Sequence, residues 1–89
     1  MKLKKIIVLL NDELNILKSV AEKNKIVELI LKTQTEINER VIITADAQQC
    51  REAGDALVDL LAEIGFDIDY SLTSEGRVID DLIDKFFIK

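Results

Sequence analysis

The fold is decided by residues 40–73, which read RVIITADAQQCREAGDALVDLLAEIGFDIDYSLT. Residues 41–44 are a β-branched run and predict a strand. Across residues 45–64 apolar side chains recur at helical spacing, and Gly65 ends that pattern. Residues 66–73 then alternate apolar and polar side chains, which is typical of a strand with one buried face. We therefore predict strand, helix and strand as one continuous unit.

The first forty residues predict a similar unit. Residues 4–10 are a dense run of Ile, Val and Leu, which suits a buried central strand, and residues 11–23 have apolar residues at helical spacing. Residues 25–33 are ambiguous: their β-branched content favours a strand, and the alternative is a helix that continues the one before. Residues 34–39 would then be a polar hairpin connection, without the Asn-Gly or Asp-Gly pair of the strongest hairpins.

The predicted order is strand, helix, strand, strand, helix, strand, followed by a helix. Right-handed crossovers in both units give a ferredoxin-like α+β sandwich with the sheet order 4-1-3-2. The alternative is a small all-α bundle, because every apolar run is short. We expect a single domain over residues 1–89, in which residues 1–73 form the βαββαβ core and residues 74–89 form a C-terminal helix.

The predicted topology leaves one face of the sheet open, and the sequence indicates that this face is apolar. Residues 4–10 are apolar at both odd and even positions, and the strand over residues 25–33 adds Ile26 and Ile30 to its second face. Large contiguous apolar patches are rare on soluble monomers. We therefore expect a cover, which is either the helix of residues 74–89 or a second copy of the chain.

The residues expected to form an interaction surface lie in two predicted elements. They are Ile26, Ile30, Val78, Leu82 and Phe86. The strand over residues 25–33 would also lie at the edge of the sheet, where a partner strand can add. These features predict a small non-enzymatic protein-binding module that self-associates as a homodimer and acts as an adaptor or inhibitor of a protein partner.

A second hypothesis concerns a basic rim of the predicted sheet. Lys5, Lys25, Thr44 and Arg77 would gather there beside two helix starts, whose N–H groups and dipoles favour anions. The chain would then be a small-molecule regulatory domain that binds an anionic metabolite or nucleotide. The alternative is that these are ordinary solvated side chains at the ends of strands and helices.

The residue types present argue against an enzyme. The sequence has no histidine, so it has no imidazole base and no His-ligated metal site. Cys50 falls on the apolar stripe of the long predicted helix, which favours a buried core residue over a nucleophile. We expect no catalytic residue, no cofactor and no metal.

Charge and hydropathy also limit the partners. The formal net charge of −5 makes this an acidic protein and nucleic acid an unfavourable partner. The apolar run of residues 6–10 is too short to cross a membrane. A single cysteine fits a reducing compartment, so we expect a cytoplasmic location.

Overall fold

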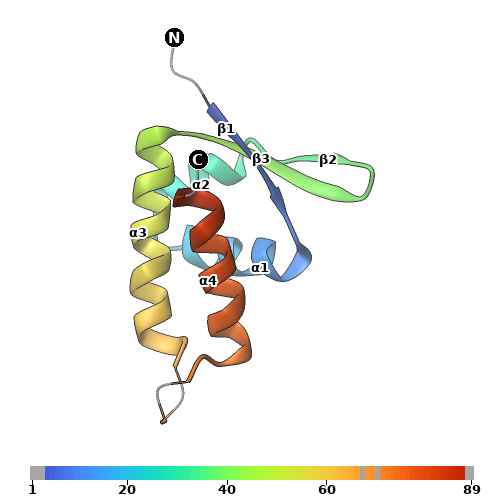
Figure 1. Cartoon of the computed structure of the whole chain (residues 1–89). Coiled ribbons are helices and arrows are strands. Elements are labelled where there is room, and N and C mark those ends of the chain that lie inside the picture. The colour runs from blue at the N-terminus through green and yellow to red at the C-terminus, as the bar shows by residue number, and fades with distance from the viewer. Residues whose placement is uncertain (1–3, 67, 70, 88–89) are drawn as a thin grey trace.

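The computed structural model describes residues 4–66, 68–69 and 71–87. In these ranges the elements are β1 (Lys4–Leu9), α1 (Asn11–Ala21), α2 (Lys25–Leu31), β2 (Thr35–Ile37), β3 (Arg40–Asp46), α3 (Ala47–Ile64) and α4 (Ser74–Phe87). Figure 1 shows α3 and α4 running side by side in opposite directions, with the short strands beside one end of the pair. The expected mixed α+β class is confirmed.

The described strands form an antiparallel sheet in the order β1-β3-β2. Ile7 of β1 lies opposite Ile43 of β3, and Thr35 of β2 lies opposite Ile42 of β3. The predicted antiparallel pairing of the first strand with residues 41–44 is therefore confirmed. It places β1 at the outer edge of the described sheet.

The turn of the β2–β3 hairpin consists of Asn38 and Glu39, a residue pair that the sequence pattern does not mark as a hairpin turn. Asn38 and Glu39 have φ values of 50° and 66°, and Ile37 pairs with Arg40 across them. A two-residue hairpin of type I′ needs positive φ at both central residues, and asparagine tolerates this conformation better than most residues do. The predicted connection of residues 34–39 thus contains the second strand itself.

The strand predicted over residues 25–33 is wrong, because residues 25–31 form the helix α2. The Asn24 side chain caps this helix: its Oδ1 accepts hydrogen bonds from the N–H groups of Ile26 and Val27 at 3.0 and 3.1 Å. Val27 and Ile30 are both fully buried. Their spacing of three residues fits one face of a helix and cannot fit one face of a strand.

The strand predicted over residues 66–73 is not found among the described residues of that range. Residues 67 and 70 lie outside the described residues, and the described ones make an isolated antiparallel bridge from Phe66 to Leu72. The segment turns back because α4 packs along α3. The Thr73 hydroxyl caps α4 by accepting from the Gly76 N–H at 2.9 Å, and a Cβ at Gly76 would collide with the Gly65 carbonyl. That close approach holds the two helix ends together.

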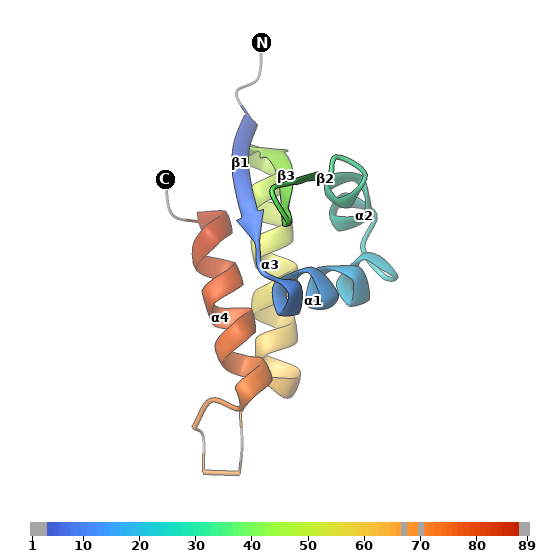
Figure 2. The same ribbon diagram turned by 90° about the vertical axis from the view of Figure 1, so that its right-hand side faces the viewer.

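The C-terminal helix belongs to the core and does not cover the open face of the sheet. Its buried side chains are Ile79, Leu82, Ile83 and Phe86. They share one apolar cluster with Ile7 and Leu9 of β1 and with residues from α1, α2 and α3. Burying four such side chains contributes very roughly 6–12 kcal/mol before chain entropy is subtracted. This gain explains why α4 lies on α3, as Figure 2 also shows.

The ferredoxin-like arrangement is therefore not confirmed. Among the described residues, the second strand is short and comes from a different segment, and β1 has no strand on its outer side. Of the predicted neighbours, the first strand and the strand over residues 41–44 are adjacent, whereas the predicted second strand is the helix α2 and no strand beside β1 is found among the described residues. The outer edge of β1 is therefore unpaired within the described sheet.

Candidate interaction site

The open face of the sheet carries large apolar side chains. Ile6 and Leu10 are each 67% exposed, and Val8 is also exposed. Val8 lies opposite Ile42, which lies opposite Thr35 in turn, so one row of this face crosses all the described strands. The apolar open face predicted from residues 4–10 is confirmed, although its members differ from those expected.

The outer edge of β1 presents backbone hydrogen-bonding groups. The Val8 carbonyl accepts from Lys85 Nζ at 3.0 Å, and the Leu10 N–H donates to Glu13 Oε1 at 2.8 Å. Because backbone groups alternate in direction along a strand, the N–H and C=O of Ile6 point to the same outer side. A strand laid beside β1 would meet these groups directly.

A buried ion pair closes one end of this edge. Glu13 of α1 is 1% exposed, and its Oε1 accepts from Lys85 Nζ at 2.6 Å. Glu13 Oε2 is buried and has no hydrogen-bond partner among the described residues. The pair joins the first turn of α1, the last turn of α4 and the Val8 carbonyl. Among the described residues, the pair occupies the Val8 carbonyl and the Leu10 N–H at the C-terminal end of this edge.

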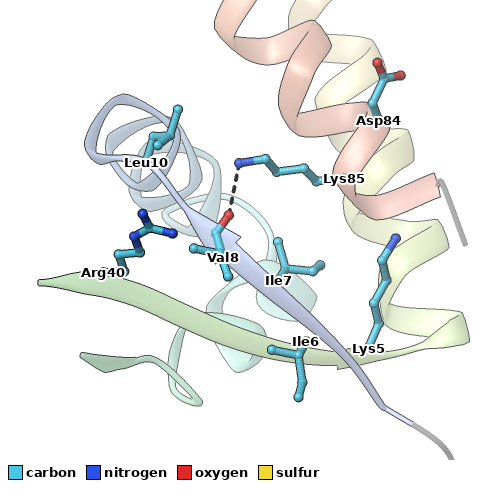
Figure 3. Close-up of a pocket in the computed structure, with 8 residues that line it drawn as sticks. All are labelled: Lys5, Ile6, Ile7, Val8, Leu10, Arg40, Asp84 and Lys85. Carbon is cyan, nitrogen blue, oxygen red and sulfur yellow. Dashed lines mark hydrogen bonds between the residues drawn. The ribbon is translucent and has the colours of Figure 1, made fainter. Parts of the chain in front are cut away.

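A groove of about 570 Å³ follows the outer edge of β1. We call it the β1 edge groove; it is lined by Lys5, Ile6, Ile7, Val8, Leu10, Arg40, Asp84 and Lys85. Figure 3 shows Ile6 and Ile7 projecting to opposite sides of the strand, with Lys85 reaching the Val8 carbonyl. Three of the lining side chains are cations and one is an anion, so the groove is locally basic in an acidic protein.

The residues predicted to bind an anion are not brought together. Lys5 lines the β1 edge groove, whereas Lys25 is exposed at the start of α2. Arg77 lies in the first turn of α4, at the end of the helix pair that is far from the start of α3 (Figure 1). A helix of the length of α3 spans about 27 Å, at 1.5 Å per residue. Arg77 and Thr44 are therefore widely separated.

The two helix starts of that hypothesis are already occupied. Thr44 does not cap α3: it lies in β3, and its N–H donates to the Thr33 hydroxyl at 2.9 Å. Asp46 caps α3 instead, because its Oδ1 accepts from the Gln49 N–H at 2.8 Å. A carboxylate thus occupies the position that an anion would need. At α4 the Gly76 N–H is bonded to the Thr73 hydroxyl.

The predicted interaction residues mostly belong to the core. Ile30 and Leu82 are fully buried and Phe86 is nearly so, which makes them unavailable to a partner. Ile26 and Val78 are half-buried. The sequence reasoning expected residues 4–10 to make the open face apolar but did not name Ile6, Val8 and Leu10 as interaction residues, and it missed Arg40, which lines the groove. The signal for the first three was the apolar run at both parities in residues 4–10.

Cys50 has the environment of a core residue. It is buried in the apolar cluster, and its Sγ lies 3.8 Å from the Ala45 carbonyl oxygen. Burial raises the pKa of the Cys50 thiol, and the nearby Lys5 ammonium offsets only some of this effect. A buried thiol with a raised pKa is a poor nucleophile at neutral pH.

Two other kinds of site are not found within the described ranges. No group of three or more Cys, Asp or Glu side chains there could hold a metal ion. None of the described helices is both long enough and apolar enough to cross a membrane. Comparison with known proteins finds no matching family model, no similar curated protein and no similar solved structure.

Proposed function

We propose that this chain is a non-enzymatic protein-interaction module that binds an extended protein segment as an added strand along β1. The observation that supports the proposal is the difference in burial between the two sides of β1. Its odd-numbered apolar side chains are buried in the core, while its even-numbered apolar side chains and outer backbone groups face the β1 edge groove. An added strand forms hydrogen bonds with the backbone groups of such an edge, and its side chains cover the apolar face at the same time.

The chemistry of the groove selects the kind of segment. Apolar side chains of β1 need apolar partners on the same face of the added strand, at every second position. Lys5 and Arg40 add positive charge, and Arg40 makes no ion pair with any described residue. An extended segment that alternates apolar and acidic residues would place its apolar side chains on the open face beside Ile6 and Val8 and its acidic side chains on the side of Lys5. By binding such a segment, the module acts as an adaptor for the protein that contains the segment, or as an inhibitor of that protein.

The regulatory alternative has less support. It required Lys5, Lys25, Thr44 and Arg77 at one rim, and they lie apart. The protein-binding proposal needs a single continuous surface, which β1 and its neighbours provide.

Two designed peptides test the proposal. One is a capped heptapeptide of alternating Val and Asp, and its matched control alternates Val and Lys. Each is titrated into ¹⁵N-labelled protein while backbone amide shifts are recorded by NMR. We expect the acidic peptide to cause saturable shifts at Ile6 and Val8, and the basic peptide to cause none. Equal responses to both peptides, or no response along β1, would contradict the proposal.

An Arg40→Glu variant sharpens the same experiment. Arg40 is exposed and pairs across the hairpin with Ile37, so its replacement should leave the fold intact. Reversal of this charge should weaken binding of the acidic peptide and strengthen binding of the basic one. Lys32→Glu, at the residue that follows α2, is the control, because the Lys32 side chain is exposed and does not line the β1 edge groove.

A further inference from the structure

The C-terminal end of the β1 edge is occupied by two side chains that form one ion pair. Lys85 Nζ donates to the Val8 carbonyl at 3.0 Å, and Glu13 Oε1 accepts from the Leu10 N–H at 2.8 Å. The same Nζ and Oε1 lie 2.6 Å apart. The pair therefore supplies one donor and one acceptor to two neighbouring outward groups of the strand.

This pair is built into the fold and differs from a solvated lysine at a strand end. Glu13 is 1% exposed, and Lys85 comes from α4, 77 residues beyond Val8 in the chain. Figure 3 shows the Lys85 side chain extending from α4 to the Val8 carbonyl. A buried carboxylate that loses its cation is strongly destabilising. The stability of the core thus holds Lys85 at the edge of β1.

The two possible directions of an added strand use the outward groups of β1 differently. Each bonded residue of a parallel strand contacts the C=O of one β1 residue and the N–H of the β1 residue two positions further on. In an antiparallel strand, each bonded residue contacts both groups of a single β1 residue. The Val8 carbonyl and the Leu10 N–H are the two groups that one parallel residue, opposite Leu9, would bond. The Glu13–Lys85 pair takes the place of that residue.

The outward groups before this point suit a parallel strand. Within the described sheet β1 pairs only with β3, and the alternation turns the backbone groups of Lys4, Ile6 and Val8 to the outer side. The Lys4 C=O with the Ile6 N–H, and the Ile6 C=O with the Val8 N–H, make two complete parallel sites. An antiparallel residue opposite Val8 would meet a carbonyl that already accepts from Lys85. Its own N–H would lack an acceptor, a loss that corresponds to roughly ten-fold in affinity.

We propose that the Glu13–Lys85 pair is an end stop, which selects a segment that runs parallel to β1 and ends its pairing at the Val8 N–H. This inference rests on the proposed function; it assigns the direction of the bound segment and makes Glu13 and Lys85 positioning residues. A parallel segment brings its C-terminal end to the pair and its N-terminal end to Lys4. The end stop also keeps the pairing short, which limits edge-to-edge association along β1.

Two tagged peptides test the direction. The acidic heptapeptide of alternating Val and Asp carries a nitroxide-labelled cysteine at its N-terminus in one version and at its C-terminus in the other. Each is added to ¹⁵N-labelled native protein. We expect the C-terminal nitroxide to broaden the Leu10 amide more than the Lys4 amide, and the N-terminal nitroxide to do the reverse. The opposite pattern, or equal broadening of both amides by each peptide, would overturn the inference.

A double variant tests whether the pair causes the selection. Glu13→Leu with Lys85→Met replaces the buried pair by apolar side chains, a change that is often neutral for stability or stabilising. It frees the Val8 carbonyl and the Leu10 N–H for an added strand. We expect this variant to lose the directional pattern and to bind the acidic heptapeptide roughly ten-fold more tightly than native protein does. A variant that keeps the native pattern and the native affinity would contradict the end stop.

Glu28→Leu with Lys32→Met is the matched control. It removes an ion pair that is exposed, and neither residue lines the β1 edge groove. This control should keep the native direction and affinity.

The native protein provides a second readout that needs no variant. Backbone carbonyl ¹³C shifts, recorded with and without the untagged heptapeptide, should change at Ile6 and stay constant at Val8. Equal changes at both carbonyls would mean that Lys85 does not close the edge. The outcomes also separate the inference from the function on which it rests. Broadening along β1 without the parallel pattern leaves the proposed function standing and refutes the end stop, whereas peptides that leave β1 unaffected refute both.

Discussion

Two adjacent isoleucines of β1 show how differently the fold treats the two sides of one strand. Ile7 is 3% exposed and packs in the apolar cluster with residues from all the described helices, while Ile6 is 67% exposed on the open face. Nothing in their chemistry separates them. The difference arises because the helices of this chain lie on one side of the sheet. One side of β1 therefore contributes to stability, and we assign the other side to binding.

Alanine substitutions at these two positions should give the largest difference in the free energy of unfolding. Ile7→Ala leaves a cavity in a closed cluster and should lower the free energy of unfolding by about 2–5 kcal/mol. Ile6→Ala removes an exposed side chain and should change it by less than about 0.5 kcal/mol in dilute protein. Urea denaturation of both variants measures the difference. Equal losses would mean that the open face is covered in the monomer.

The two ends of the β1 edge can also be compared, because the Glu13–Lys85 pair covers only the C-terminal end. Lys85→Met leaves the Glu13 carboxylate buried without its cation and should cost about 3 kcal/mol, at the low end for buried pairs because Lys85 is partly exposed. Lys32→Met is the matched control. It removes the exposed Lys32–Glu28 pair, whose nitrogen and oxygen are 3.7 Å apart, and should cost under about 0.5 kcal/mol. Thermal unfolding at low protein concentration compares them; similar losses would show that the Glu13 site is open to water.

The smallest effect concerns Asp69, which lies between α3 and α4. The Ser71 hydroxyl and N–H lower the pKa of Asp69, so Ser71→Ala should raise it towards its ordinary value. A carboxyl titration followed by ¹³C NMR measures this pKa. The folded pKa is the lower one, so the stabilisation from these bonds is present above the unfolded pKa and is lost as the pH falls through the folded pKa. An unchanged midpoint in Ser71→Ala would show that the Asp69–Ser71 bonds do not form in solution.

Sequence reasoning succeeded where one local signal decided the structure. The strand at residues 4–10, the strand at 41–44 and the helix across 45–64 each had a clear pattern, and the structure has all three. The α+β class and the neighbouring positions of β1 and β3 followed from them.

Sequence reasoning failed where packing between distant segments decided it. Residues 25–31 have β-branched content, but the Asn24 cap and burial at a spacing of three residues make them a helix. Residues 66–73 have a strict strand pattern, yet α4 packs against α3 and the described residues of this range form no strand of the sheet. The site moved for the same reason: with helices in different places, the exposed edge became β1 and Leu82 and Phe86 became core. No local signal marks Arg40 as a groove residue.

Amide hydrogen exchange at Ile6 and Ile7 tests the central claim most directly. The Ile7 N–H points towards β3 and should exchange slowly at every protein concentration, whereas the Ile6 N–H points to the outer edge. We predict that the Ile6 amide exchanges fast in the free protein and becomes protected when the acidic peptide is added, while Ile7 does not change. An Ile6 amide that exchanges at the same rate with and without the peptide, whether fast or slow, would contradict the assignment of the β1 edge as the site of strand addition.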